Sequence, residues 1–552
     1  MKSSGFRISL LLSGTIFISH VAHSQTLQDA IKLTNNEKFE KADKAFKSLQ
    51  SAQPGAGNVY FYRGENFYNW GKTDSAQNVY QKGTDVNALE PLNYVGLGKV
   101  EMVNGDSKSA MDNFYKAKTI SKGKDPLVLS KTAEAYISLA GKEQAMASDL
   151  LKQAVDLIKQ AISLDSKNAN YHLDLGDAYL AQNPSDGSKP IEEYNTALSL
   201  DPKSVNAMLR LGRLWKNARD YNTSFDFFKK ATQLDSTFAP AYREQAEMLY
   251  EAGRYDEAIA AYVKYLQLNN SLSARARYGS FLYLAKKYDN AITELQNVLS
   301  LDSTNIVLYR LLGYSQYEKK DYKNGLINMN KFFTKEKGTK VKLLGSDYSY
   351  LGKLLSNTGQ DSLAIIALNQ AISVINNPTS PDVIDNYLLI AKIYYKDQNY
   401  AMAVTYFNKR IAARGQAADA NDYYYLGLAQ YNNKQYQGAD SSFGMITKSN
   451  PDLPLGYQWR ARANSQLDST QTLSKPYYEQ YIQKVGSDTL KNKDGLIEAY
   501  SQLGYYYLLQ KDKPNASMYY RKILNLDPDN ANAKAYFESL KPRPVPKTQG
   551  KK

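Results

Sequence analysis

The sequence repeats a pattern with a period of about 34 residues, and this period constrains the fold more than any other feature. In each repeat a small residue, here called the anchor, is followed by a second small residue at +12 and a large apolar residue at +16, as in Gly98, Ala110 and Phe114. Two helices of about a dozen residues joined by a tight turn give this spacing, because small residues allow close approach and the large one fills the gap. Nine further sets begin at Gly64, Gly212, Ala246, Gly279, Gly313, Gly352, Ala391, Gly427 and Gly504.

Turn signals occur at the expected places between these helices. Within a repeat, Asn104-Gly105-Asp106 marks a tight turn, and between repeats Leu200-Asp201-Pro202 marks the end of one helix and the start of the next. Proline and serine end a helix, whereas aspartate or serine caps the following one. The pattern therefore predicts a chain of helical hairpins without strands.

The order of aromatic residue, Leu, Gly, Ala, Phe and Ala over 34 residues resembles the tetratricopeptide repeat (TPR) family. The resemblance covers residues 26–540 in about fourteen units, ten of them in register, and the first unit contains Ala30, Ala42 and Phe46. It implies an all-α fold, a right-handed α-solenoid, for residues 25–540. Departures from the pattern predict longer connections at 139–149 and 183–187, junctions at 334–346 and 484–495, and a degenerate unit at Trp459 and Ala463.

The N-terminus has the order of a secretory signal. Lys2 and Arg7 precede an apolar run at 8–21, and Ala22-His23-Ser24 supplies small residues for a signal peptidase. We therefore expect residues 1–24 to be a signal peptide cleaved after Ser24 and the mature protein to be periplasmic, with no transmembrane span. An uncleaved anchor is the alternative, although the run is short for a span of about 20 residues.

The composition argues against catalysis. The chain has no Cys and three His, and two of these lie in the predicted signal, so that only His172 remains. A Cys–His dyad and a two-His metal site are therefore excluded, and His172 is interpreted as a packing residue. Asp527-Pro528-Asp529-Asn530 lacks the glycine and glutamate of a calcium loop. We expect no enzyme activity, no cofactor and no metal.

The net charge of +14 at first suggests nucleic acid as a partner. The predicted signal and the basic, proline-rich segment 541–552, expected to be disordered, carry much of this excess. Export and the spread of the remaining charge argue against nucleic acid, while peripheral contact with an anionic membrane remains an alternative. Protein or peptide partners of the cell envelope are expected, and the oligomeric state is left open.

The resemblance implies a concave face lined by the first helix of each unit, where TPR domains bind partner segments. The residue four after each anchor is often Tyr, and Tyr combined with Arg is typical of binding hot spots. The alternative is that these rings pack between units. The predicted partner-binding groove comprises, at the +4 position, Tyr68, Tyr250, Tyr283, Tyr317, Tyr395 and Tyr431, and, three before the anchor, Tyr424, Arg243, Arg310 and Arg460.

Three short segments resemble the Asp-Ser/Thr-apolar sites that Bacteroidota O-glycosylate on exported proteins: Asp74-Ser75-Ala76, Asp361-Ser362-Leu363 and Asp488-Thr489-Leu490. The alternative is that Asp-Ser simply starts a helix well. The chain is thus expected to be an exported, Bacteroidota-like multi-TPR scaffold of an envelope assembly, transport or secretion system. The alternative is an envelope receptor for glycans or peptides, similar in role to SusD-like binders but without their lipoprotein cysteine.

Overall fold

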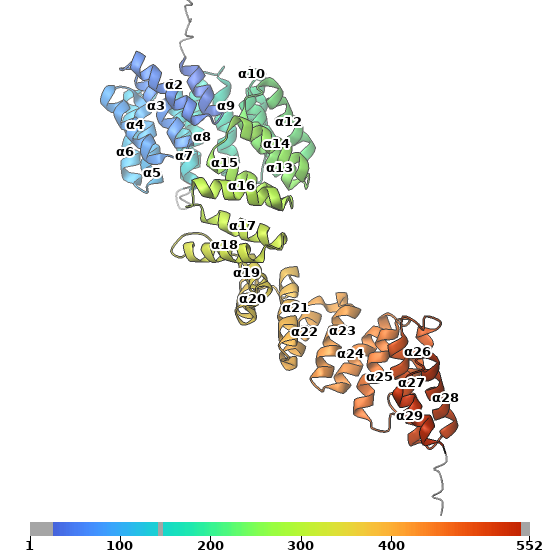
Figure 1. Cartoon of the computed structure of the whole chain (residues 1–552). Coiled ribbons are helices and arrows are strands. Elements are labelled where there is room, and N and C mark those ends of the chain that lie inside the picture. Colours follow the sequence, from blue (N-terminus) through green and yellow to red (C-terminus); the bar gives the residue numbers. More distant parts are fainter. Residues whose placement is uncertain (1–25, 142–146, 542–552) are drawn as a thin grey trace, which may run out of the picture. The chain divides into compact units, whose positions relative to one another are not determined.

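A computed structural model describes residues 26–141 and 147–541 (Figure 1). Over these ranges the chain forms 29 α-helices and one 3₁₀ turn, η1 (Gly415–Ala417), and contains no strand. The predicted all-α solenoid of TPR units is therefore confirmed, since α1 to α28 make fourteen helix pairs and α29 follows them. The predicted signal and, apart from Lys541, the basic tail lie outside the described residues.

The helices fall into two compact units, residues 1–294 and 295–552, and the boundary lies inside α16. The first unit contains α1 (Leu27–Asn35), α2 (Phe39–Ala52), α3 (Gly57–Asn69), α4 (Thr73–Val86), α5 (Pro91–Val103), α6 (Ser107–Ile120), α7 (Pro126–Ala140), α8 (Ala147–Leu164), α9 (Ala169–Gln182), α10 (Ser188–Leu200), α11 (Val205–Asn217), α12 (Tyr221–Leu234), α13 (Ala239–Glu251), α14 (Tyr255–Leu268), α15 (Leu272–Leu284) and the first part of α16 (Tyr288–Leu301).

The second unit begins within α16 and carries the remaining helices. They are α17 (Ile306–Glu318), α18 (Tyr322–Lys335), α19 (Gly345–Asn357), α20 (Asp361–Ile375), α21 (Pro381–Lys396), α22 (Tyr400–Arg414), α23 (Ala420–Asn432), α24 (Tyr436–Ser449), α25 (Pro454–Leu467), α26 (Lys475–Val485), α27 (Lys493–Leu509), α28 (Lys513–Leu526) and α29 (Ala531–Ser539). The segments 336–344 and 486–492 connect helices, where the sequence predicts longer junctions.

The anchors hold the two helices of each pair together, as their spacing predicts. A Cβ atom added to Gly98 would lie 2.7 Å from Cε1 of Phe114 and 3.0 Å from the carbonyl oxygen of Ala110. Nearly all of the large residues at +16 are buried, for example Phe228 and Phe443, each 0% exposed, whereas Tyr520 is partly exposed. Close helix approach and a filled core therefore arise from the same repeated positions.

Most of the described turns inside the pairs place one residue in the left-handed region. In the turn after α5, Gly105 has a φ of 86°, its N–H bonds the Met102 carbonyl at 3.1 Å, and the N–H of Asp106 bonds the Glu101 carbonyl at 2.9 Å. These are the two bonds of a Schellman motif, which favours glycine at the left-handed position. Other turns have a non-glycine residue there, such as Lys286 at 59° and Glu37 at 57°.

Candidate functional site

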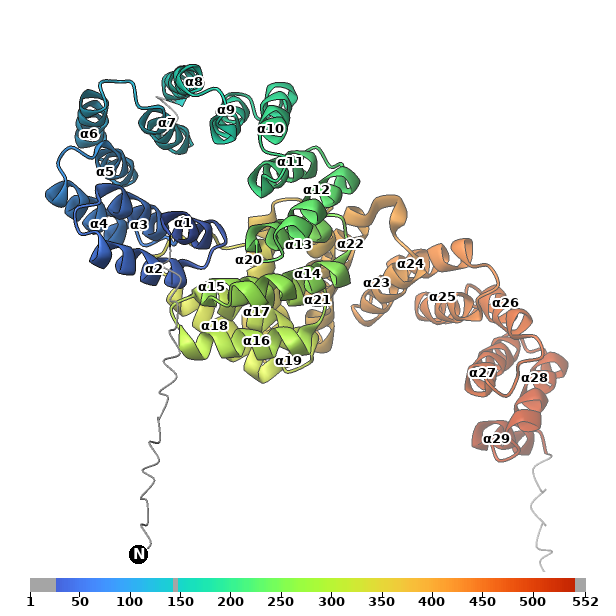
Figure 2. The same cartoon turned by 90° about the horizontal axis from the view of Figure 1, so that it is seen from above.

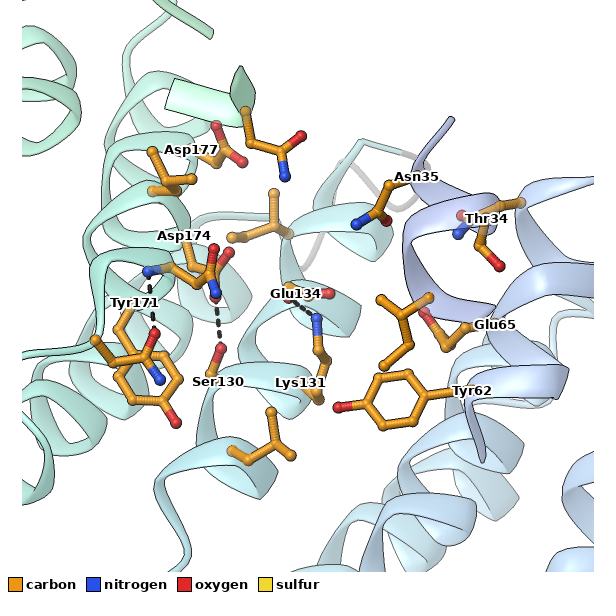
Figure 3. Close-up of a pocket in the computed structure, with 18 of the residues that line it drawn as sticks. Thr34, Asn35, Tyr62, Glu65, Ser130, Lys131, Glu134, Tyr171, Asp174 and Asp177 are labelled. Atoms are coloured by element: carbon orange, nitrogen blue, oxygen red, sulfur yellow. Dashed lines mark hydrogen bonds and ion pairs between the residues drawn. The ribbon is translucent and has the colours of Figure 1, made fainter. Parts of the chain in front are cut away.

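A cavity of about 570 Å³ lies inside the first unit (Figure 3). Nearly all of its lining comes from α1, α3, α5, α7, α9 and α11, the first helices of six successive pairs. Its volume lies within the ordinary range of ligand pockets, about 300–1,000 Å³. The first helices thus form a concave wall in this unit, as the resemblance to the family implies.

Two positions of the repeat supply the charged lining of this cavity. Glu65, Lys99, Glu134 and Asp177 each follow their anchor by one residue, and Tyr62, Lys131, Asp174 and Arg210 each precede it by two. Residues three apart on a helix lie on the same face. The repeat therefore places these side chains together, although the groove predicted from the sequence uses other positions.

Most of the cavity's charges are paired, and two pairs join neighbouring repeats. Nζ of Lys99 lies 2.9 Å from Oε2 of Glu65, and Nε of Arg210 lies 2.8 Å from Oδ2 of Asp177. Within α7, Lys131 pairs with Glu134. Burial alone would lower the pKa of Lys131, but Glu134, Asp174 and Glu65 together raise it above its ordinary value.

The same alternation of charge continues along the first helices of the next repeats. Arg213 bonds Glu244 at 2.9 Å, and Arg277 bonds Glu247 at 2.6 Å. Opposite charges therefore bridge successive repeats from α3 to α5 and from α9 to α15 on this unit. Such a polar wall suits hydrogen bonding to a polar chain segment better than burial of an apolar one.

Asp174 differs from the other carboxylates of the cavity. Its Oδ2 accepts a 2.5 Å hydrogen bond from Oγ of Ser130, and the residue is only 7% exposed. Burial, reinforced by the negative charge of Glu134, raises the pKa of Asp174 to about 7, although Lys131, Ser130 and Arg210 act in the opposite direction. The cavity can therefore gain or lose one negative charge near neutral pH.

We expect Asp174→Asn to change how stability depends on pH. Because the folded-state pKa is raised, the folded protein binds more protons than the unfolded chain between about pH 4 and pH 7, so wild-type stability falls as pH rises through that window. Between pH 4 and pH 8, the free energy of unfolding of the variant should rise relative to that of the wild type by at least about 1.4 kcal/mol, which corresponds to one pKa unit. Urea unfolding at both pH values measures this, and parallel curves would contradict it.

The predicted column of tyrosines does not line the cavity, and its side chains are half-buried. Five of its six rings contact the tyrosine five residues later, across the turn inside the pair, with ring centroids 5.3 to 6.0 Å apart. Some also contact the next repeat, as Tyr250 does with Phe281 and Tyr431 with Trp459. Tyr68 instead has Nζ of Lys99 4.0 Å from its ring centroid, which places it beside the cavity. Packing thus accounts for much of the column, and a role in partner binding stays a prediction.

The predicted residues three before the anchor have partners within the chain. Arg243 pairs with Glu37, and Arg310 is buried against Asp347. The remaining two are Arg460, whose Nε lies 2.9 Å from Oδ1 of Asp440, and Tyr424, which contacts Phe443 and Trp459.

His172, the histidine outside the predicted signal, contacts the second helix of its own pair. Nδ1 of His172 lies 2.7 Å from Oε2 of Glu193, so this ring links α9 to α10. Over 26–141 and 147–541, no group of three or more His, Asp or Glu side chains is arranged to hold a metal ion. Within the same ranges, no helix has the length and apolar character needed to cross a membrane.

Comparisons with known proteins identify the repeat. Models of the tetratricopeptide repeat match residues 243–306, 384–414, 423–452 and 497–530. The CTR9 homolog of Arabidopsis thaliana is 23% identical over 266 residues, which is 47% of this chain and 24% of that protein. The TPR repeat-containing protein YpiA of Bacillus subtilis is 26% identical over 272 residues, which is 48% of this chain and 61% of that protein. The chain therefore spans less than two thirds of the length of these relatives.

One solved structure combines higher identity with full coverage. It is the C-terminal part of a TPR repeat-containing protein from Cytophaga hutchinsonii, 34% identical, with a TM-score of 0.40, covering 48% of this chain and 100% of that one. The four repeat matches show that the chain carries tetratricopeptide repeats.

Proposed function

We propose that this protein is an exported, non-enzymatic scaffold of the cell envelope, which holds segments of partner proteins against the first helices of its repeats. TPR proteins generally mediate protein–protein interaction, and no catalytic family is indicated for this chain. The observation that carries the proposal is the polar cavity of the first unit, built by six successive first helices. The signal-like order of residues 1–24 supports export to the periplasm.

The lining of the cavity favours a particular kind of partner segment. Its amides, among them Asn35, Asn69 and Asn206, offer both donors and acceptors to a peptide backbone. Among the described residues no cation forms an ion pair with the carboxylate of Asp174, whereas its neighbours Glu134 and Asp177 have such partners. We therefore expect an extended, polar segment that carries a lysine or arginine.

Site-specific photo-crosslinking in the native envelope tests this proposal. A photoreactive amino acid in place of Ser138, which lines the cavity on α7, should form adducts with one or a few envelope proteins. The matched control is Tyr115 on α6, the second helix of its pair, whose side chain is 73% exposed. Adducts at Tyr115 as abundant as those at Ser138, or none at Ser138, would contradict a binding role for the cavity.

A further inference from the structure

The turn that joins α1 to α2 contacts residues about 200 positions later in the first unit. Nζ of Lys32 lies 3.0 Å from Oδ2 of Asp235, and Nδ2 of Asn36 donates a 3.0 Å hydrogen bond to Oγ1 of Thr237. Asp235 and Thr237 belong to the connection between α12 and α13. The contacts therefore join the first pair of helices to the connection between the sixth and seventh pairs.

Glu37 makes the most extensive of these contacts. One carboxylate oxygen pairs with the guanidinium of Arg243 on α13. The other accepts hydrogen bonds from the hydroxyl of Tyr265 at 2.7 Å and from Nδ2 of Asn269 at 3.3 Å, at the end of α14. Three donors from two elements thus converge on a single side chain, which is 14% exposed.

The turn itself does not require a glutamate at this position. Glu37 has a φ of 57°, and the equivalent left-handed positions in other turns of this unit hold Gly71, Gly105 and Gly253 but also Arg219 and Lys286. Glycine adopts this conformation at less cost than residues with a side chain. Glu37 is distinguished from these residues by its contacts with α13 and α14, and not by its backbone conformation.

These contacts close the first unit on itself. Figure 2 shows α3 to α12 following an arc that begins at α1 and ends at α13. The cavity lies along this arc, and its lining includes Thr34 and Asn35 from α1 and Arg210 from α11. The two ends of the arc, and with them two walls of the cavity, are therefore joined by Lys32, Asn36 and Glu37, which we call the clasp.

The interface at the clasp is polar and incompletely packed. Cavities of about 270 Å³ and 230 Å³ border it, the first lined in part by Lys32, Asn36 and Asp235 and the second in part by Glu37 and Asn269. Partly exposed ion pairs contribute modestly and are screened by salt. An interface built from a few such bonds, with gaps on either side, can open without unfolding the helices that it joins.

We propose that Lys32, Asn36 and Glu37 form a releasable clasp that closes the first unit over its cavity, and that a partner segment enters when the clasp opens. The first part depends only on contacts within the chain, whereas entry of a partner rests on the proposed function. Two states that differ by a few polar bonds are close enough in free energy for a ligand to shift their populations.

Distance measurements between spin labels test the clasp directly. The chain has no cysteine, so Lys44→Cys on α2 and Ala260→Cys on α14, both exposed, introduce the only two labelling sites. With the clasp intact we expect one narrow distance distribution. Glu37→Ala should add a longer, broader component and raise the open fraction roughly tenfold, equivalent to about 1.4 kcal/mol. Salt at 1 M should act in the same direction.

A neighbouring acidic residue provides the matched control. Glu40→Ala removes an exposed carboxylate from the same hairpin without touching the clasp bonds, and should leave the narrow distribution unchanged. An unchanged distribution in Glu37→Ala and in Arg243→Ala would overturn the proposal. Loss of helix content in Glu37→Ala would overturn it too, because the hairpin would then be part of the core and not a releasable element.

The crosslinking assay separates the two parts of the inference. If the clasp controls entry, Glu37→Ala should speed adduct formation at Ser138 in native envelopes. A clasp that opens in the distance measurements but leaves the rate of adduct formation unchanged would refute its role in entry. Opening without any adduct at Ser138 would instead refute the proposed function and leave the clasp itself established.

Discussion

Asp347→Ala is expected to lower the free energy of unfolding of the second unit by about 3–5 kcal/mol, the usual cost of leaving one member of a buried ion pair alone. Asp347 is 0% exposed on α19. Its carboxylate accepts hydrogen bonds from Nη2 of Arg310 at 2.8 Å, the hydroxyl of Tyr314 at 2.6 Å and the backbone N–H of Leu344 at 2.6 Å. The substitution leaves the buried donors of Arg310 and Tyr314 without this acceptor, and the partly buried N–H of Leu344 also loses its bond.

The effect should be local, because repeat arrays are stabilised by contacts between neighbouring repeats. Hydrogen exchange of the native protein should lose protection in α17 to α20 first. The control is Asp452→Ala, which removes a fully exposed carboxylate whose partner is Lys484 and should change protection little. Equal losses in the two variants would show that the burial of Asp347 contributes nothing.

Gly64→Ala should destabilise the first unit by about 1–3 kcal/mol, as overpacking of a filled core does. The new Cβ would lie 2.1 Å from Cε1 of Tyr80, and a Cβ on Gly96 would lie 2.4 Å from the same atom. The ring is thus confined between two repeats, and its hydroxyl donates a 2.6 Å hydrogen bond to Glu65. Because the ring cannot move aside, one methyl group is enough to disturb both repeats.

The same substitution at another helical glycine should have the opposite sign. A Cβ on Gly444, inside α24, would meet only atoms of Arg460 at 3.6 Å or more, which is ordinary contact. Gly444→Ala should therefore stabilise the protein by up to about 1 kcal/mol through helix propensity. Chemical denaturation of both variants measures the two changes in the free energy of unfolding. Stabilisation by Gly64→Ala would mean that the spacing of α3 and α4 is looser than the anchor pattern requires.

The helix pairs and their core could be predicted from the sequence because their determinants are local. A small residue, a second one 12 positions later and a large one at 16 decide how two adjacent helices pack. Gly98, Ala110 and Phe114 do so in the structure as the pattern predicts. The left-handed turn at Gly105 follows from the same local chemistry.

Most residues of the candidate site were not predicted, because the tertiary structure decides which column of residues faces the cavity. The sequence pattern favours the tyrosines four after the anchor as the groove, whereas the cavity is lined by the positions one after and two before it. A signal was available at one of these positions, since Lys131, Asp174, Arg210 and Glu244, each two before its anchor, alternate in charge from repeat to repeat. Composition drew attention to the abundant tyrosines, and these rings pack largely across their own turns.

By itself, then, the sequence determined the repeat, the number of helix pairs and the residues that hold each pair together, because these depend on spacing within about 34 residues. The tertiary structure decided which column faces the cavity, that Arg310 is buried against Asp347, and that Glu37 reaches Arg243. The last contact joins residues 206 positions apart. This contact depends on the small rotation of each repeat relative to the one before it, added up over six repeats. No single repeat encodes the total rotation.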